Sequence, residues 1–449
     1  MSYDLTTGNL FRRLISFSLP YFLSYFMQSL YGLVDLFVIG LYNGTATVAA
    51  VSIGSQVMHM LTVMIVGLAM GATVRIGFAV GQKDQERAAK TIGNSVTFFA
   101  CFALICMVLL LICTNGIAGL MQTPPESMKE TIQYLRICFA GIPFVVAYNV
   151  ISSIFRGKGD SKTPMVFVAI ACFVNIVLDF LLIGGFHWGA VGAAWGTVLA
   201  QAVSVGCALL WLRRRPLGFP FYKESFRPKA AVLKEITVVG GPIALQDGLI
   251  QVAFLLITVI ANTRGVTIAA GVGIVEKIIS FLFLVPSSML SSISAMTAQN
   301  IGAGKFVRVR KTLNYGFAIC LAYGIIVSAY CWFFPETLLR LFSDDPDVII
   351  YGCQYLSAYA LDCVFAGIHF CFSGYYCGCG HSGVSFFHNL ISIMFVRIPG
   401  TYLAAQVFPA SLFPMGLAAP CGSILSALIC VIFYFILKKR GRLYPMMRM

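Results

Sequence analysis

The chain has 449 residues, of which 59% are apolar and only 11% are charged. Soluble domains carry about 25% charged residues, so this composition excludes a set of soluble domains and also an intrinsically disordered chain. The formal charge is +14, with 31 Lys and Arg against 17 Asp and Glu. In a soluble protein that charge would indicate nucleic acid as a partner, so its interpretation depends on where the basic residues lie.

Apolar stretches of spanning length recur along the chain, with short polar breaks between them. A helix needs roughly 20 apolar residues to cross about 30 Å of hydrocarbon, whereas a membrane barrel would show alternating segments of about 10 residues. We predict spans at Phe11–Gly40, Val48–Met70, Thr91–Cys113, Met128–Phe155, Pro164–Ile183, Gly189–Leu212, Ala231–Asn262, Ile268–Ala298, Leu313–Phe334, Val348–Tyr376, Val384–Phe408 and Gly416–Leu437. The predicted fold is therefore an all-α polytopic membrane protein with twelve transmembrane helices.

The breaks between the predicted spans alternate in charge. Most basic residues fall before the first span, in every second break after it, and in the tail from Lys438 to Arg448. The positive-inside rule then places both termini and the central loop in the cytoplasm, which agrees with an even number of spans. The basic loops are thus interpreted as a topology signal in a multi-pass protein of the cell (inner) membrane, and no nucleic-acid partner is predicted.

The two halves of the sequence match each other. At a shift of 221 residues, Arg87 pairs with Arg308, and Gly157-x-Gly159 pairs with Gly378-x-Gly380. Each half has six spans, so the halves share one orientation and are related by an axis along the membrane normal. We expect two pseudo-symmetric six-helix lobes, suited to alternating access, at residues 1–212 and 231–449, joined by a cytoplasmic linker at residues 213–230.

Four polar side chains share one depth in the N-terminal half. Asp35 and Asp179 each lie about five residues from the outer end of a span, Asn175 precedes Asp179 by one turn, and Thr197 lies in the next span. An ionised side chain inside a membrane costs at least about 2.5–3.5 kcal/mol, so these carboxylates need an explanation. Their oxygen atoms suit Na⁺ or a proton, and two carboxylates in one site make protonation and cation binding compete. The alternative is that each Asp makes a satisfied contact between helices.

Other residues inside the spans are candidates for movement or substrate binding. Pro20 lies below Asp35 in the first span, where it removes a backbone hydrogen bond and permits a kink, so we predict a hinge or else a static kink. Asp247, Glu276 and Asp362 lie nearer mid-depth in the second half. They are predicted to line a substrate cleft, with pairing to Arg397 as the alternative.

Two local patterns are rejected as functional motifs. The Gly378-x-Gly380-x-x-Gly383 segment matches a dinucleotide fingerprint, but it follows a helix and not a strand. His369, Cys371, Cys377, Cys379 and His381 do not fit zinc spacing. No nucleotide-binding, metalloprotease or serine-hydrolase motif occurs, so we predict neither a cofactor nor enzymatic activity.

Several motifs together resemble the multidrug and toxic compound extrusion (MATE) family. They are the basic loop after the second predicted span with its copy Gln299–Lys305, the segment Arg156–Lys162, and Asn175-x-x-x-Asp179. The resemblance covers essentially the whole chain. It implies an antiporter that exports small organic, often cationic, compounds through the bilayer by using inward flow of Na⁺ or H⁺.

The resemblance also carries residue roles. In prokaryotic members an Asp of the first span, an Asn and an Asp of the fifth and a Thr of the sixth build the cation site, which implies Asp35, Asn175, Asp179 and Thr197 here. Pro20 matches the proline at which the family's first helix is proposed to bend.

The resemblance has limits in the second half. Asp247 and Asp362 lie about a turn away from the acidic residues of a C-terminal cation site that some members carry, so that site is not transferred. Cys377 and Cys379 stand where the first half has Arg156 and Lys158.

The predicted function is a monomeric secondary active multidrug exporter. A lipid-linked oligosaccharide or lipid flippase of the same superfamily is the first alternative, and it would need a cleft rich in Arg and Lys for pyrophosphate. A membrane receptor or enzyme without transport activity is the second, and it would need a catalytic motif or an added soluble domain.

Overall fold

The computed structural model describes residues 4–444, and within this range it contains helices and no strands. Ten helices are long and apolar enough to cross a membrane, and two bent helix pairs raise the number of spans to twelve. These spans coincide with the twelve predicted from hydropathy, so the predicted all-α polytopic fold is confirmed. Arg448, which was counted among the basic residues of the tail, lies outside the described residues.

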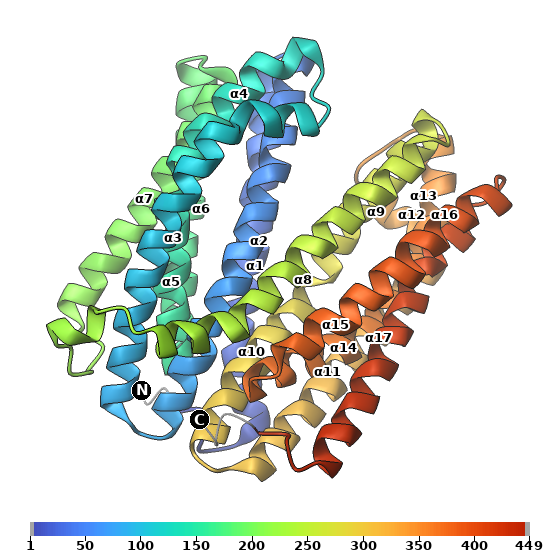
Figure 1. Cartoon of the computed structure of the whole chain (residues 1–449). Helices are drawn as coiled ribbons and strands as arrows, with labels where there is room; N and C mark the ends of the chain where they lie inside the picture. The colour runs from blue at the N-terminus through green and yellow to red at the C-terminus, as the bar shows by residue number, and fades with distance from the viewer. Residues whose placement is uncertain (1–3, 445–449) are drawn as a thin grey trace. The chain divides into compact units, whose positions relative to one another are not determined.

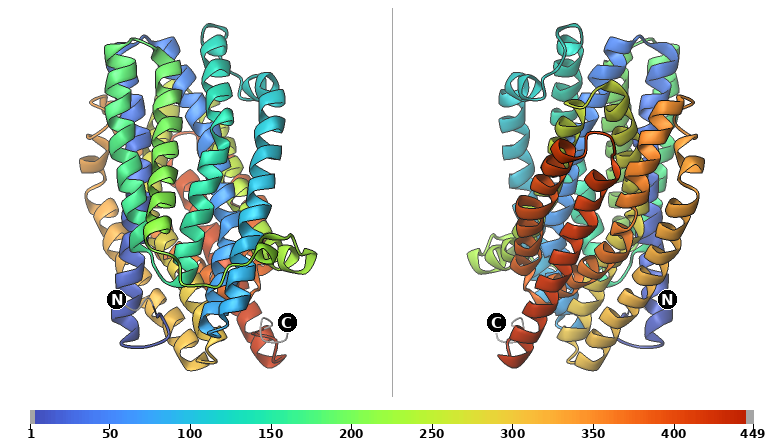
Figure 2. Two further views of the ribbon diagram at one scale, coloured as in Figure 1. Left: turned by 90° about the vertical axis from the view of Figure 1, so that its left-hand side faces the viewer. Right: turned by 90° about the vertical axis from the view of Figure 1, so that its right-hand side faces the viewer.

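By contacts, the chain divides into two compact units. The first consists of residues 1–4 and 19–240. Its helices α1 to α7 are labelled in Figure 1, and the long ones run alongside one another in both views of Figure 2. They are α1 (Leu10–Tyr42) from Leu19 onward, α2 (Thr45–Gly81), α3 (Gln85–Leu120), α4 (Pro125–Ala140), α5 (Ile142–Lys158), α6 (Lys162–Asp179), the π-helix η1 (Phe180–Gly185), α7 (Gly189–Arg214) and the short 3₁₀ helix η2 (Lys223–Phe226).

The second unit consists of residues 5–18 and 241–449. Beyond the start of α1 and the greater part of α8 (Ala230–Asn262), it contains α9 (Val266–Leu282), α10 (Leu284–Gly302), α11 (Phe306–Phe333), α12 (Pro335–Leu339), α13 (Pro346–Tyr359), α14 (Asp362–Cys379), α15 (Ser382–Ser392), the π-helix η3 (Ile393–Arg397), α16 (Ile398–Val407) and α17 (Phe413–Lys439). The division into functional lobes at residues 1–212 and 231–449 stays a prediction.

Two spans of the first unit and their counterparts in the second begin and end at positions 221 residues apart, which is the shift between the matching halves of the sequence. The span Thr45–Gly81 has its counterpart in Val266–Gly302, and the bent pair α4–α5 has its counterpart in α13–α14. The two pairs bend by 45° and 42°. The predicted internal repeat therefore extends to where helices begin, bend and end.

The paired glycine motif ends equivalent helices. Gly159 and Gly380 have φ values of 100° and 88° and cap α5 and α14 in the left-handed conformation, which glycine adopts without steric cost. A Cβ at Gly378 would overlap the backbone carbonyl of Ser294, and one at Gly157 would crowd Thr73 and Ile76. These glycines therefore serve helix capping and close packing, which agrees with rejecting a dinucleotide site.

The first helix of each repeat belongs to both units. α1 passes from the second unit to the first between Ser18 and Leu19, directly before Pro20. α8 passes from the first unit to the second between Gly240 and Gly241, directly before Pro242. Within the second unit, Arg308 donates hydrogen bonds to the carbonyls of Leu5 and Gly8 at 3.3 and 2.9 Å.

The segment between α7 and α8 packs on the first unit. Asn94 of α3 donates to the carbonyl of Ser225 at 3.1 Å, and Lys158 of α5 donates to the carbonyl of Leu217 at 2.6 Å. The predicted linker at residues 213–230 is thus ordered against the ends of α3 and α5 that carry the basic residues. We call this end of the unit its basic end.

Candidate cation and substrate sites

The four residues predicted to form a cation site converge in the first unit. Asp35 comes from α1, Asn175 and Asp179 from α6, and Thr197 from α7. The hydroxyl of Thr197 donates a hydrogen bond to Asp35 Oδ2 at 3.4 Å. The Asp35 carboxyl group also lies beside the side chains of Asp179 and Asn175. Residues that are far apart in sequence therefore form one polar cluster.

This cluster is buried and poor in hydrogen bonds. Asp35, Asn175 and Asp179 are 3%, 2% and 0% exposed. Five of their polar side-chain atoms have no hydrogen-bond partner among the described residues: Asp35 Oδ1, both oxygens of Asp179, and both terminal atoms of Asn175. Buried polar atoms are normally paired because an unpaired one costs about 1–3 kcal/mol. The cluster therefore has the chemistry of a site that a proton or a small cation completes.

Backbone geometry around Asp179 is unusual in two respects. The π-helix η1 begins at the residue after Asp179, and π-helical turns inside α-helices occur frequently at functional sites. Gly196 of α7 faces this carboxylate so closely that a Cβ would overlap Asp179 Oδ1. Gly196 was not predicted as a site residue, since nothing in the sequence shows which carboxylate a glycine faces.

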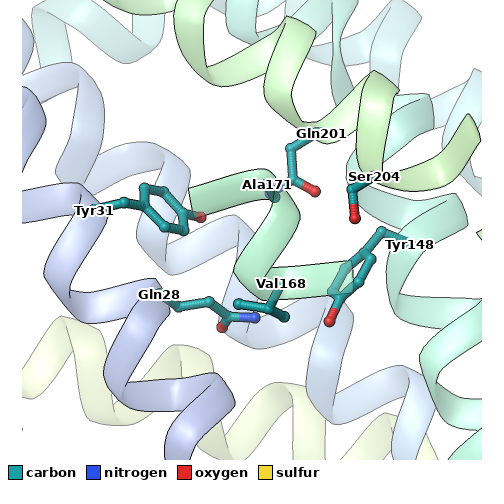
Figure 3. A pocket seen from close by; sticks show the side chains of 7 residues that line it. All are labelled: Gln28, Tyr31, Tyr148, Val168, Ala171, Gln201 and Ser204. Atoms are coloured by element: carbon teal, nitrogen blue, oxygen red, sulfur yellow. The ribbon is translucent and has the colours of Figure 1, made fainter. Parts of the chain in front are cut away.

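A small pocket, shown in Figure 3, is formed by residues of the helices that hold the cluster and of α5. Gln28, Tyr31, Tyr148, Val168, Ala171, Gln201 and Ser204 line it. Three of these residues lie one helical turn from the cluster: Tyr31 precedes Asp35 by four residues, Ala171 precedes Asn175 by four, and Gln201 follows Thr197 by four. The same three helices therefore hold both the cluster and the pocket. The sequence prediction did not include these neutral residues, and their one signal in the sequence is the four-residue spacing from Asp35, Asn175 and Thr197.

The acidic residues of the second unit do not form one cluster. Asp362 is buried and pairs with Arg397 at 3.2 Å, so the alternative of pairing with Arg397 holds for this residue. Glu276 accepts a hydrogen bond from Thr258 at 3.0 Å. Asp247 lies near Cys377, about four turns along α14 from Asp362. Asp247 therefore lies apart from Asp362, whereas Glu276 and Asp362 both lie near Tyr355 and Tyr359. The substrate cleft predicted at these three residues stays a prediction.

Comparisons with known proteins agree with this fold. The family model MatE matches residues 20–181 and again residues 242–403, so the second match lies 222 residues after the first. The "Probable multidrug resistance protein YpnP" of Bacillus subtilis is 29% identical over 408 residues, which is 90% of both chains. The "Probable multidrug resistance protein NorM" of Thermotoga maritima is 26% identical and covers 89% of this chain and 87% of its own length.

Solved structures give the same result for the fold. One described as the outward-facing conformation of a multidrug resistance MATE family transporter of the MOP superfamily matches with a TM-score of 0.91 and 21% identity, and it covers 100% of this chain and 99% of its own. A MOP superfamily transporter from Pyrococcus furiosus also reaches 0.91 and 21%, with 98% of both chains covered. Because the family model matches both halves, the resemblance found in the sequence is confirmed, and the chain belongs to the MatE family of multidrug and toxic compound extrusion proteins.

Proposed function

We propose that this protein is a secondary active multidrug exporter that moves small organic compounds, often cationic, out of the cell in exchange for Na⁺ or H⁺. The observation that carries this proposal is the buried cluster of Asp35, Asn175 and Asp179, whose unpaired polar atoms adjoin a pocket held by the same helices. Relatives over most of the chain bear multidrug resistance or export names. The family consists of membrane transporters, which confirms the prediction that the chain is not an enzyme.

The charge distribution supports an orientation for this exporter. The basic end of the first unit and the chain termini are proposed to face the cytoplasm, as the positive-inside rule requires. The cation cluster then lies toward the outer surface and the pocket lies below it. The protein is proposed to act as a monomer in the cell membrane.

Exchange requires only that ion and drug bind the two states of the transporter differently. An Asp35–Asp179 pair without a cation or proton places two like charges in a buried site, which is unfavourable. Binding of a cation or proton from outside removes this repulsion, and we propose that it favours the state that releases drug outward. Tyr31 and Gln201 link the pocket to the cluster because each lies one turn from a cluster residue.

Pro20 is proposed as the hinge of this change. α1 passes from one unit to the other directly before Pro20, and Ser24 donates a hydrogen bond to the Pro20 carbonyl at 2.7 Å. Asp247 and Glu276 remain proposed contacts for cationic substrates, whereas the charge of Asp362 is already met by Arg397.

The test is ethidium efflux from vesicles under an imposed Na⁺ or H⁺ gradient. Asp35→Asn and Asp179→Asn are compared with the wild type and with Glu126→Gln, which changes an exposed acid of the same unit. We expect efflux in the wild type and in Glu126→Gln, and little in the two Asp variants. Full gradient-driven efflux by both Asp variants would contradict the coupling role. Absence of efflux of any cation by the wild type would contradict multidrug export and favour a lipid flippase.

A further inference from the structure

Arg156 is a buried arginine without an acidic partner. It lies in the last turn of α5 at the basic end of the first unit and is 7% exposed. Its guanidinium carbon lies 4.3 Å from the ring centroid of Tyr21. Its Nε has no hydrogen-bond partner, and no carboxylate lies within ion-pair distance of it among residues 4–444.

Two other arginines with buried guanidinium atoms form ion pairs, in contrast to Arg156. Arg75 pairs with Glu235 at 3.3 Å, and Arg397 pairs with Asp362 at 3.2 Å. A buried charge is costly unless it is paired and hydrogen-bonded. The face of Tyr21 and the carbonyl end of α5 both attract a cation, but Arg156 Nε donates a hydrogen bond to neither.

None of the acids at the basic end of the first unit forms an ion pair with Arg156. Asp160 accepts hydrogen bonds from the backbone of Lys162 and Thr163, both at 3.0 Å. Glu235 pairs with Arg75 and Arg87, and Glu86 pairs with Lys90. Three loops of the second unit are proposed to lie on the same side of the membrane. They contain no Asp or Glu, and they comprise residues 300–311, 377–382 and 438–444. Among residues 4–444, the Arg156 guanidinium therefore has no acidic partner and can accept a carboxylate from outside the protein.

Polar side chains at helical spacing lie between Arg156 and the residues that line the pocket. Tyr148, Ser152 and Arg156 follow one another at four-residue spacing on one face of α5. Tyr148 lines the pocket together with Gln28 of α1 (Figure 3). On α1, Tyr25 and Tyr21 lie between Gln28 and the basic end, and their rings are 6.1 Å apart. Seven residues separate Gln28 from Tyr21, or about 10 Å along a helix.

We propose that Arg156 is an oxyanion subsite that binds the carboxylate of a zwitterionic aromatic substrate. A guanidinium binds a carboxylate through two parallel hydrogen bonds, and Tyr21 and Tyr25 supply aromatic faces beside it. Arg156 thereby determines specificity, because it favours substrates that carry a carboxylate over those that do not. The repeat supports a role confined to one unit, since Cys377 occupies the equivalent position in the second. This inference rests on the proposed export function.

The test uses two dyes that differ at one group. Rhodamine 110 carries a free carboxylate, and rhodamine 123 is its methyl ester with the same rings. Binding to the purified protein is measured by fluorescence anisotropy, and efflux is measured in vesicles under an ion gradient. The variants are Arg156→Gln and Arg156→Lys, with Lys162→Gln as a control for loss of an exposed charge six residues away.

We expect Arg156→Gln to weaken rhodamine 110 binding roughly tenfold or more, as loss of a hydrogen-bonded charge pair implies, and to leave rhodamine 123 binding unchanged. Arg156→Lys should fall between, because Lys keeps the charge without the fork, and it tests the proposal even where Arg156→Gln fails to fold. Equal changes for both dyes, or no change for either in Arg156→Gln and Arg156→Lys, would overturn the subsite.

Further measurements distinguish a substrate carboxylate from a lipid headgroup, and failure of the subsite from failure of the proposed function. If the variants weaken both dyes only in vesicles that contain phosphatidylglycerol, the oxyanion is a lipid headgroup and the proposal is wrong. If the wild type exports neither rhodamine 123 nor ethidium, the proposed function fails. If it exports both but Arg156→Gln leaves the preference between the two rhodamines unchanged, only the subsite fails.

Discussion

Thr197 and Asp35 are 162 residues apart in sequence, and the Thr197 hydroxyl donates a hydrogen bond to the Asp35 carboxylate at 3.4 Å. This contact joins α7 to α1 at the level where α6 contributes Asn175 and Asp179. Three helices are thus connected through side chains that a proton or cation would bind. A change in the charge of either carboxylate therefore affects the contacts of all three helices.

Replacing Thr197 by Ala should weaken ion coupling without abolishing transport. A hydrogen bond of this kind contributes about 0.5–1.5 kcal/mol net, so the ion concentration for half-maximal ethidium efflux should rise about 3- to 10-fold. Thr197→Ser keeps the hydroxyl and should stay near wild type. An unchanged ion dependence in Thr197→Ala would show that the hydroxyl takes no part in the site.

Gly196→Ala should damage the same site by steric means. The added Cβ overlaps Asp179 Oδ1 and displaces the carboxylate, while such overpacking costs only about 1–3 kcal/mol of stability. We expect folded protein that has lost most gradient-driven efflux. Gly206→Ala is the matched control. Gly206 lies on the same helix, and a Cβ there would meet nothing within 4 Å. Normal efflux in Gly196→Ala would contradict the assigned position of Asp179.

The role of some charged residues could be predicted from the sequence, and that of others could not. Asp35 and Asp179 were predicted because an acid inside a span is costly and both lie at one depth. The pairing of Asp362 with Arg397 could not be chosen over substrate binding, because the two lie 35 residues apart on different helices. Gln28, Tyr31 and Gln201 escaped notice because neutral polar residues are inexpensive in a helical bundle and only the fold brings them together. The spans were predictable throughout, since each one is continuous in sequence.

Asp362→Ala should destabilise the second unit strongly. Removing one partner of a buried ion pair leaves an unpaired charge and costs about 3–5 kcal/mol, here at Arg397. The double variant Asp362→Leu with Arg397→Met should recover much of this loss, because it removes both charges. Thermal unfolding of the purified variants measures both effects. A single variant as stable as the wild type would show that the pair is not required.

Adjacent glycines of α8 should respond differently to substitution. A Cβ at Gly240 would overlap the carbonyl of Leu68 on α2, whereas a Cβ at Gly241 would meet nothing within 4 Å. Gly240→Ala should therefore lower stability by about 1–3 kcal/mol. Gly241→Ala should leave it unchanged or raise it slightly, because Ala favours the helix over Gly. Equal melting temperatures would contradict the close packing of α2 and α8.

The most direct test of the account is the reverse of drug export. Vesicles that contain the protein are given an ethidium gradient and no ion gradient, and the movement of Na⁺ or H⁺ is recorded. An antiporter that couples ion and drug through Asp35 and Asp179 must move the ion against the drug. We predict ethidium-driven ion flux in the wild type and none in Asp35→Asn or Asp179→Asn. Ion flux of wild-type size in both variants would contradict the account.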